Sequence, residues 1–194
     1  MNVEVISESP VDLDEYARVS IGFTVAEVLD DAAVDAALRG GPIAAAVPLE
    51  VPYEKNYDSH PGSRPADWRA GFDIAEWQFV AAFLDGRRVG GAVLIPNGRV
   101  GLERLDGHVD PALLWDIRVA PAVRRQGIGA ALLDHVTREA RERGATELLV
   151  ETQQINVPAC RFYAAHGFRL LGARRQADPN LPDETQLLWS KSLG

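Results

Sequence analysis

The sequence predicts a single α/β domain over residues 1–194, and three features of the chain lead to that prediction. The first is a strand, Leu113–Val119, that leads through a basic turn into a helix. The second is the apolar strand Thr146–Val150 after that helix, because a helical crossover joins parallel neighbours in a sheet. The third is the pair of strands Glu76–Leu84 and Arg88–Ile95, which an Asp-Gly turn signal joins as a hairpin.

Composition is that of an ordinary globular protein and argues against several classes of function. The net charge of −8 disfavours generic nucleic-acid binding and favours cationic partners. Cys160 is the only cysteine, so no intrachain disulfide can form, which suits the cytosol. The first residues lack the pattern of a signal peptide, and no apolar run is long enough to span a bilayer. We expect a cytoplasmic protein that binds neither nucleic acid nor membrane.

The N-terminal part of the chain predicts two strands and a helix. Weak alternation of apolar residues indicates an edge strand at residues 2–6, and Tyr16–Thr24 alternates more clearly. Asp30 or Asp31 is a typical N-cap for a helix over Ala32–Leu38, which two glycines end.

The middle of the chain is less regular. Ile43–Val51 is predicted to be a strand or an extended segment. Pro52–Asp73 contains three prolines and mixes aromatic with acidic residues, so no helix or strand of normal length fits it. It is either a surface loop anchored by its aromatic residues or a binding wall for a cation. Gly90 and Gly91, inside a predicted strand, indicate a bulge or a close approach of another group to the backbone.

The C-terminal half has the clearest periodicity. Apolar residues recur every fourth position from Ile128 to Ala140, so this helix has one face against a sheet. Asn156 is a good N-cap for a second helix. That helix ends at Gly167, and two strands are predicted after it, Phe168–Ala173 and Thr185–Ser192.

The turn before the first of these helices has the properties of an anion-binding site. Gly127 and Gly129 let an anion approach the backbone closely, and a helix N-terminus carries a partial positive charge. A P-loop would need Lys and Ser or Thr where Ala130 and Ala131 stand. A dinucleotide-binding turn would need a third glycine where Leu132 stands. Both of these alternatives are therefore rejected.

This turn, Arg124–Ala130, resembles the R/Q-x-x-G-x-G/A acyl-CoA signature of the GNAT superfamily of N-acyltransferases. A second GNAT signature follows one strand later, with Asn156, the string Ala159–Tyr163 and then a Gly-Phe pair. The segment Leu148–Tyr163 is similar to the streptothricin acetyltransferase branch of the superfamily, as are short stretches around Phe23 and Tyr53.

The resemblance implies a mixed central sheet of about six to seven strands with flanking helices, splayed between Leu113–Val119 and Thr146–Val150. It implies that acetyl-CoA enters that split, with the pantetheine along the first strand and the pyrophosphate on the turn. The residues implied to bind it are Ile117, Val119, Arg124, Arg125, Gln126, Gly127, Ile128, Gly129, Ala130, Asn156 and Ala159.

Acetyl transfer to an amine needs a base and an acid. An alkylammonium has a pKa of about 10.4 and must lose a proton before it attacks. The resemblance implies that Tyr163 is the general acid; the alternative is a tyrosine packed in the core. Asp116 or Glu151 is the candidate base, although either is equally explained as a solvated or salt-bridged carboxylate, for example with Arg118. Glu103 is a weaker third candidate.

Cys160 fits a small buried residue better than a nucleophile, and the four histidines have no metal-ligand spacing, so no metal is expected. The predicted function is direct transfer of an acetyl group from acetyl-CoA to a primary amine of a small cationic substrate. Two alternatives stay open, a protein lysine or N-terminal acetyltransferase and a non-catalytic acyl-CoA-binding regulatory domain. A homodimer also stays open.

Overall fold

The structure of the protein is a computed structural model that describes residues 3–9, 11–43, 46–96, 111–177 and 181–194. The chain forms two compact units. The first unit comprises Met1–Gly22, Asn56–Leu148 and Leu193, and the second comprises Phe23–Lys55, Leu149–Ser192 and Gly194. One domain over the whole chain stays a prediction.

The described residues form nine strands, five α-helices and three 3₁₀-helices. The strands are β1 (Val3–Glu8), β2 (Phe23–Val28), β3 (Val47–Lys55), β4 (Gln78–Leu84), β5 (Arg87–Ile95), β6 (Pro111–Val119), β7 (Glu147–Gln153), β8 (Arg169–Arg175) and β9 (Thr185–Ser192). The helices are α1 (Leu13–Ala17), α2 (Asp31–Leu38), α3 (Trp68–Gly71), α4 (Ile128–Glu142) and α5 (Val157–Ala165), with η1 (Tyr57–Ser59), η2 (Pro65–Asp67) and η3 (Pro121–Val123).

Seven strands form a sheet in the order β1-β4-β5-β6-β7-β9-β8, and β2 pairs with β3 in a separate ribbon. The predicted α/β class with flanking helices is therefore confirmed. The predicted splay and the parallel direction of β7 stay predictions. Within the described part of the chain, no helix is long and apolar enough to cross a membrane.

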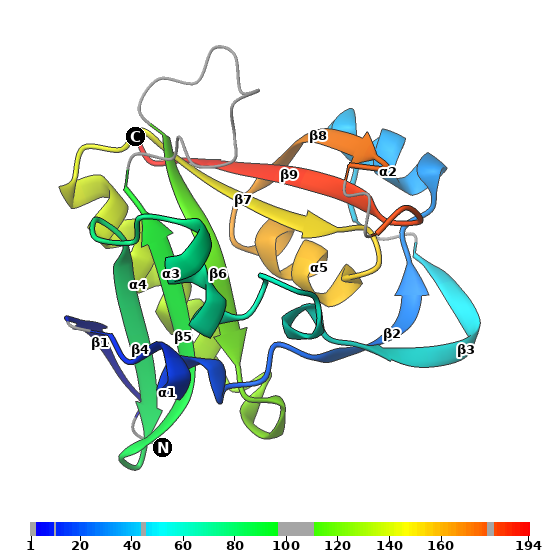
Figure 1. Ribbon diagram of the computed structural model, residues 1–194. Coiled ribbons are helices and arrows are strands. Elements are labelled where there is room, and N and C mark those ends of the chain that lie inside the picture. The colour runs from blue at the N-terminus through cyan, green and yellow to red at the C-terminus, as the bar shows by residue number, and fades with distance from the viewer. Residues whose placement is uncertain (1–2, 10, 44–45, 97–110, 178–180) are drawn as a thin grey trace. The chain divides into compact units, whose positions relative to one another are not determined.

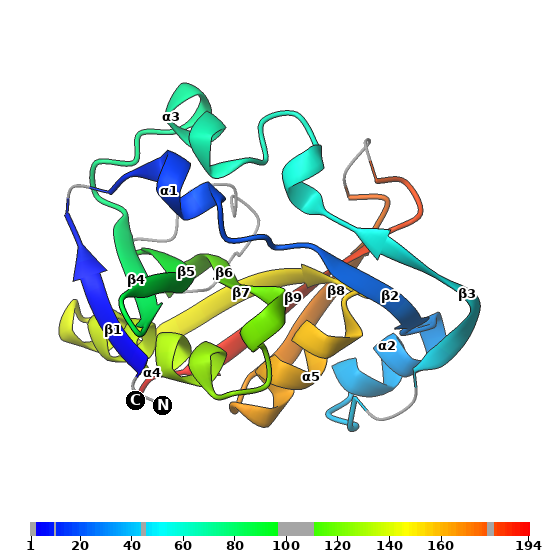
Figure 2. The ribbon, with the colours of Figure 1, turned by 90° about the horizontal axis from the view of Figure 1, so that it is seen from below.

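In the first unit, β1, β4, β5 and β6 form successive antiparallel pairs. Helix α4 covers one face of these strands, and α1 and α3 lie on the opposite face (Figures 1 and 2). The predicted stripe of α4 is confirmed, because Ile128, Leu132, Val136 and Ala140 are all buried. Burial of this apolar face is what holds the helix, and hence the turn before it, against the sheet.

The two glycines of β5, Gly90 and Gly91, are explained by both causes that the sequence predicts, a bulge and the close approach of another group to the backbone. The register between β4 and β5 shifts next to Gly90, which marks a bulge. A Cβ added at Gly91 would lie 2.4 Å from Cε2 of Tyr16, so only glycine leaves room for this ring.

In the second unit, α5 lies beside β7 and β9, and α2 lies beside β8 (Figure 1). Asp30 caps α2 as predicted, its side chain accepting a hydrogen bond from the Ala33 N–H at 2.8 Å. Arg175 of β8 forms an ion pair with Asp31 of α2 at 2.9 Å. The strand predicted at residues 185–192 is β9 without change.

The predicted strand Tyr16–Thr24 is wrong in its first part. Tyr16 lies in helix α1, and β2 begins at Phe23. The carboxylate of Asp12 caps α1 by accepting the N–H groups of Asp14 and Glu15, each at 3.0 Å. Because Leu13 and Tyr16 are three residues apart, they share the buried side of this helix.

The segment Pro52–Asp73 is also more regular than predicted. Its first four residues belong to β3, which begins at Val47 and contains two prolines. A strand that pairs on one side only tolerates proline, because its other edge needs no N–H donors. The rest of the segment forms η1, η2 and α3.

Candidate active site

The turn between β6 and α4, in the first unit, presents backbone N–H groups that the helix does not use. Arg125 and Gly127 have φ angles of 64° and 85°, in the left-handed region. The first hydrogen bond of α4 runs from the Ala131 N–H to the Gly127 carbonyl at 3.0 Å, and among the described residues no side chain caps the helix. The N–H groups of residues 128–130 therefore lack an intrahelical acceptor. Together with the positive end of the helix dipole, they fit a pyrophosphate.

Arg124 holds this turn rather than extending from it. Its Nε donates to the Val119 carbonyl at 2.8 Å, and its Nη2 donates to the Ser20 carbonyl at 3.3 Å. Arg125 and Gln126 are exposed. The structure thus gathers the predicted pyrophosphate-binding residues in one turn, and their contact with the cofactor stays a prediction.

Strand β6 contains the two residues implied to bind the pantetheine. Ile117 and Val119 are half-buried and pair with Ala92 and Gly90 of β5. The register shifts at Trp115, which is the extra residue of a bulge. Bulges often lie beside active sites because they re-aim neighbouring side chains.

Asp116 is held in a dense set of hydrogen bonds. Its Oδ1 accepts the Tyr16 hydroxyl at 2.7 Å and the Nε of Arg118 at 2.8 Å, and its Oδ2 accepts Nη2 of Arg118 at 2.7 Å. The side chain of Asp116 is 7% exposed and that of Arg118 is 1% exposed. The salt-bridged alternative for Asp116 is confirmed, and its role as a base stays a prediction.

Arg118 uses all five of its N–H donors. Besides the bonds to Asp116, Nη1 donates to the Val19 carbonyl at 3.1 Å and to Oδ2 of Asp58 at 3.0 Å, and Nη2 donates to Oδ1 of Asp58 at 3.3 Å. The guanidinium also lies 5.0 Å from the centre of the Tyr16 ring. We call Tyr16, Asp58, Asp116 and Arg118 the Arg118 network.

The network changes the acid–base properties of its members. Burial raises the pKa of Tyr16 well above its ordinary value, and the charge of Asp116 raises it further. Burial lowers the pKa of Arg118, but the charge and hydrogen bonds of Asp116 outweigh this effect, so the pKa is raised overall. Tyr16 is therefore a neutral hydrogen-bond donor, and Arg118 is a permanent cation.

Sequence reasoning did not find most of this network. The sequence pattern predicts Tyr16 in a strand, and Asp58 lies 60 residues before its partner Arg118. The one available signal was the spacing of Asp116 and Arg118, because residues two apart on a strand share a face.

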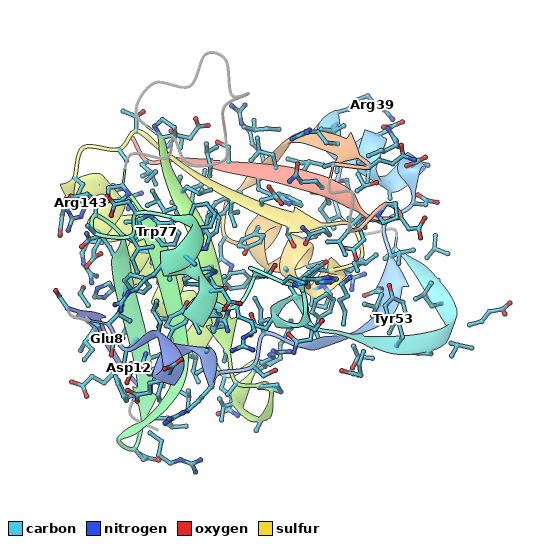
Figure 3. All side chains as sticks on the ribbon, in the orientation of Figure 1. Glu8, Asp12, Arg39, Tyr53, Trp77 and Arg143 are labelled. Atoms are coloured by element: carbon cyan, nitrogen blue, oxygen red, sulfur yellow. The ribbon has the colours of Figure 1, made fainter. Side chains whose placement is uncertain are left out.

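The aromatic residues after η2 anchor their segment. Trp68 is 2% exposed, and its ring centre lies 5.9 Å from that of Trp77, which lies beside α3 (Figure 3). The ring centres of Phe72 and Trp77 lie 5.0 and 5.1 Å from the ring centre of Trp115. Anchoring by aromatic residues is confirmed for this part of the segment, and a binding wall for a cation stays a prediction.

Tyr163, in the second unit, lies on the buried face of α5 and is 4% exposed. Its ring packs against Phe162, Phe168 and Trp189, with centre-to-centre distances of 5.5, 5.4 and 6.4 Å. These contacts fix the ring and agree with a core tyrosine; its role as general acid stays a prediction.

The other predicted residues of the second unit lie at the start of α5 or in β7. Asn156 caps this helix, its Oδ1 accepting the Ala159 N–H at 3.3 Å. The Ala159 N–H is therefore already hydrogen-bonded. The remaining polar groups of Asn156 and Ala159 stay candidates for binding the cofactor. Glu151 is exposed near the carboxyl end of β7, next to the buried Thr152.

Cys160 is fully buried, and burial raises the pKa of its thiol to about 12. A thiol that stays protonated is a poor nucleophile, so its predicted role as a small buried residue is confirmed. Glu103 lies outside the described residues. In the described part of the chain, no group of three or more His, Cys, Asp or Glu side chains could hold a metal ion.

Comparison with known proteins agrees with these features. Residues 48–168 match the model of the acetyltransferase (GNAT) family. The chain is 32% identical over 172 residues to streptothricin acetyltransferase of Streptomyces lavendulae, covering 87% of this chain and 82% of that protein. It is 36% identical over 87 residues to [ribosomal protein bS18]-alanine N-acetyltransferase of Escherichia coli K12, covering 44% and 59% of the two chains.

The fold agrees with a solved structure of a streptothricin acetyltransferase candidate from Bacillus anthracis in complex with acetyl coenzyme A. The TM-score is 0.73 at 22% identity, with 99% of each chain covered. The chain therefore belongs to the acetyltransferase (GNAT) family, in its streptothricin acetyltransferase branch, and is an acetyl-CoA-dependent N-acetyltransferase.

Proposed function

We propose that the acceptor of this N-acetyltransferase is a primary amine of a small cationic molecule of the streptothricin type. The observation that carries this proposal is the identity to the Streptomyces lavendulae enzyme over 82% of that protein's length. The net charge of −8 agrees with a cationic acceptor, because an acidic surface attracts it over a distance. A cytoplasmic location is part of the proposal.

Within this proposal, the turn before α4 binds the pyrophosphate of acetyl-CoA, and β6 binds its pantetheine along Ile117 and Val119. The thioester of acetyl-CoA supplies the acetyl group. Glu151 is the better candidate to take the amine proton, because Asp116 already accepts three hydrogen bonds, two of them from a cation. We assign Asp116 the role of a positioning residue and Tyr163 that of the acid that protonates the leaving thiolate.

Thiol release from acetyl-CoA in the presence of streptothricin tests the function directly. Streptothricin, lysine, polyamines and the N-terminal peptide of ribosomal protein bS18 form the panel of acceptors. We expect streptothricin to have the highest kcat/KM. A higher value for the peptide would support the protein acetyltransferase alternative, to which the shorter match with the Escherichia coli enzyme points.

The roles of individual residues are tested with Tyr163→Phe and with Glu151→Gln beside Asp116→Asn. Tyr163→Phe should lower kcat by about 10²–10⁴-fold while acetyl-CoA binding is unchanged, because general acid catalysis contributes factors of this size. Glu151→Gln should lower kcat by about 10²–10⁴-fold with streptothricin as acceptor, whereas Asp116→Asn should lower it less. No transfer to any acceptor by the wild type, with intact acetyl-CoA binding, would support the non-catalytic alternative.

A further inference from the structure

The second unit contains an acidic residue, Glu184, whose two neighbours in the chain are held by hydrogen bonds to one glutamine. Glu184 lies directly before β9. The side-chain carbonyl of Gln154 accepts the Thr185 N–H at 2.6 Å, and its side-chain amide donates to the Asp183 carbonyl at 3.2 Å. The backbone N–H of Gln154 also donates to the Thr185 carbonyl at 3.0 Å. Gln154, directly after β7, thus fixes the backbone of the residues on either side of Glu184.

This carboxylate forms an ion pair with an alkylammonium group from the chain itself. Lys55, the last residue of β3, donates its Nζ to Oε1 of Glu184. The Lys55 side chain is 15% exposed and that of Glu184 is 11% exposed, so the pair is mostly buried yet reaches solvent.

Aromatic side chains stand next to this pair. Phe23 of β2 pairs with Lys55 across the ribbon. Tyr53, labelled in Figure 3, is two residues before Lys55 and therefore on the same face of β3. Tyr53 is 45% exposed, and partial burial and the charge of Glu184 both raise its pKa. A fixed carboxylate beside aromatic rings is a general arrangement for binding an organic cation.

We propose that Glu184 determines acceptor specificity by binding an ammonium group of the substrate, and that Lys55 is an internal competitor that occupies Glu184 when no substrate is bound. The inference rests on the proposed cationic acceptor. The amine that attacks must be neutral, so the ammonium on Glu184 is a second cation of the same molecule. The enzyme therefore favours acceptors with two or more amines. Because the pair still reaches solvent, an incoming ammonium can approach Glu184 and exchange with Lys55, so that one cation replaces another and the carboxylate stays paired.

The test compares Glu184→Gln with Lys55→Met, using streptothricin as acceptor and acetyl-CoA as donor. Glu184→Gln should raise the KM for streptothricin by roughly tenfold or more, because it removes a charge-assisted hydrogen bond. Lys55→Met should lower the same KM by about two- to fivefold, because it removes the competitor. Lys55→Arg should resemble the wild type, and neither main variant should change the KM for acetyl-CoA.

A purely structural ion pair gives a different result. In that case Lys55→Met and Glu184→Gln shift the streptothricin KM in the same direction or not at all, and either outcome overturns the inference. Arg175→Met, which breaks the exposed pair with Asp31 in the same unit, is the matched control and should leave KM unchanged. Thermal unfolding checks that each variant is folded.

Calorimetry with streptothricin separates this inference from the proposed function. If the wild type binds streptothricin but transfers no acetyl group, the proposed function fails. Binding that is tighter in Lys55→Met and weaker in Glu184→Gln would still support the cation site. Equal affinities in the three proteins, or no binding by the wild type, would overturn it.

Discussion

Replacing Arg118 by methionine is the sharpest test of what holds the first unit together around β6. Methionine is unbranched and apolar, like the aliphatic part of the arginine side chain, and the substitution removes five N–H donors. It leaves Asp116 and Asp58 close together without the cation between them. It also leaves the Val19 carbonyl without the donor that Nη1 provides at 3.1 Å.

The burial of the partners sets the expected size of the effect. Asp116 is 7% exposed at its side chain and Asp58 is 16% exposed, so water can only partly replace the guanidinium. Removing one partner of a buried ion pair costs about 3–5 kcal/mol of unfolding free energy. For a chain of this length, 1 kcal/mol corresponds to roughly 2–4 °C, so the melting temperature should fall by about 10 °C. Arg118→Lys should restore little, because one ammonium cannot reach all the acceptors.

Urea unfolding of the wild type, Arg118→Met and Arg161→Met measures this difference. The exposed pair of Arg161 with Glu27 should contribute less than about 1 kcal/mol, which makes Arg161→Met a matched arginine control. If Arg118→Met unfolds within about 1 kcal/mol of the wild type at an unchanged m-value, the argument from burial is refuted.

Three further predictions follow from single positions. Gly91→Ala should lower the unfolding free energy by about 1–3 kcal/mol in urea titrations, because its Cβ would meet the Tyr16 ring; a neutral effect would mean that the ring can move. Gly127→Ala should lower the unfolding free energy by about 1 kcal/mol or more and weaken acetyl-CoA binding in calorimetry, because its φ of 85° strains any other residue; unchanged binding would contradict the proposed role of this turn in binding the pyrophosphate. The thiol of Cys160 should react with a disulfide reagent only on unfolding. Its pKa rises from about 8.5 in the unfolded chain to about 12 in the folded chain. The protonated thiol therefore stabilises the folded chain fully when the pH is below the pKa of the unfolded chain, and this stabilisation is lost as the pH rises from that pKa to the pKa of the folded chain. Cys160→Ala should remove this part of the loss of stability at alkaline pH.

The local features of the site could be predicted because neighbouring residues produce them. The glycine turn, the apolar stripe of α4 and the Asn156 cap each depend on residues within one or two turns of one another. The same reasoning misplaced Tyr16, because its spacing fits a short helix as well as a strand, and the cap at Asp12 decides between them.

Contacts between distant segments could not be predicted in this way. Nothing near Asp58 in the sequence marks it as a partner of Arg118, and nothing near Glu184 marks it as a partner of Lys55. Such pairs depend on how elements far apart in the chain come together, and a single sequence records only the residue types.

The sequence by itself determined that this protein has an acyl-CoA turn between a strand and a helix, followed by the second signature of its family. Those features are local, since a turn, a cap and a helix face are built from adjacent residues. Only the tertiary structure decided that Asp116 is bound to Arg118 and Tyr16 and that Gly91 makes room for the Tyr16 ring. The physical reason is that burial and ion pairing depend on what surrounds a side chain in space, and for Asp116 those surroundings include a segment 100 residues away.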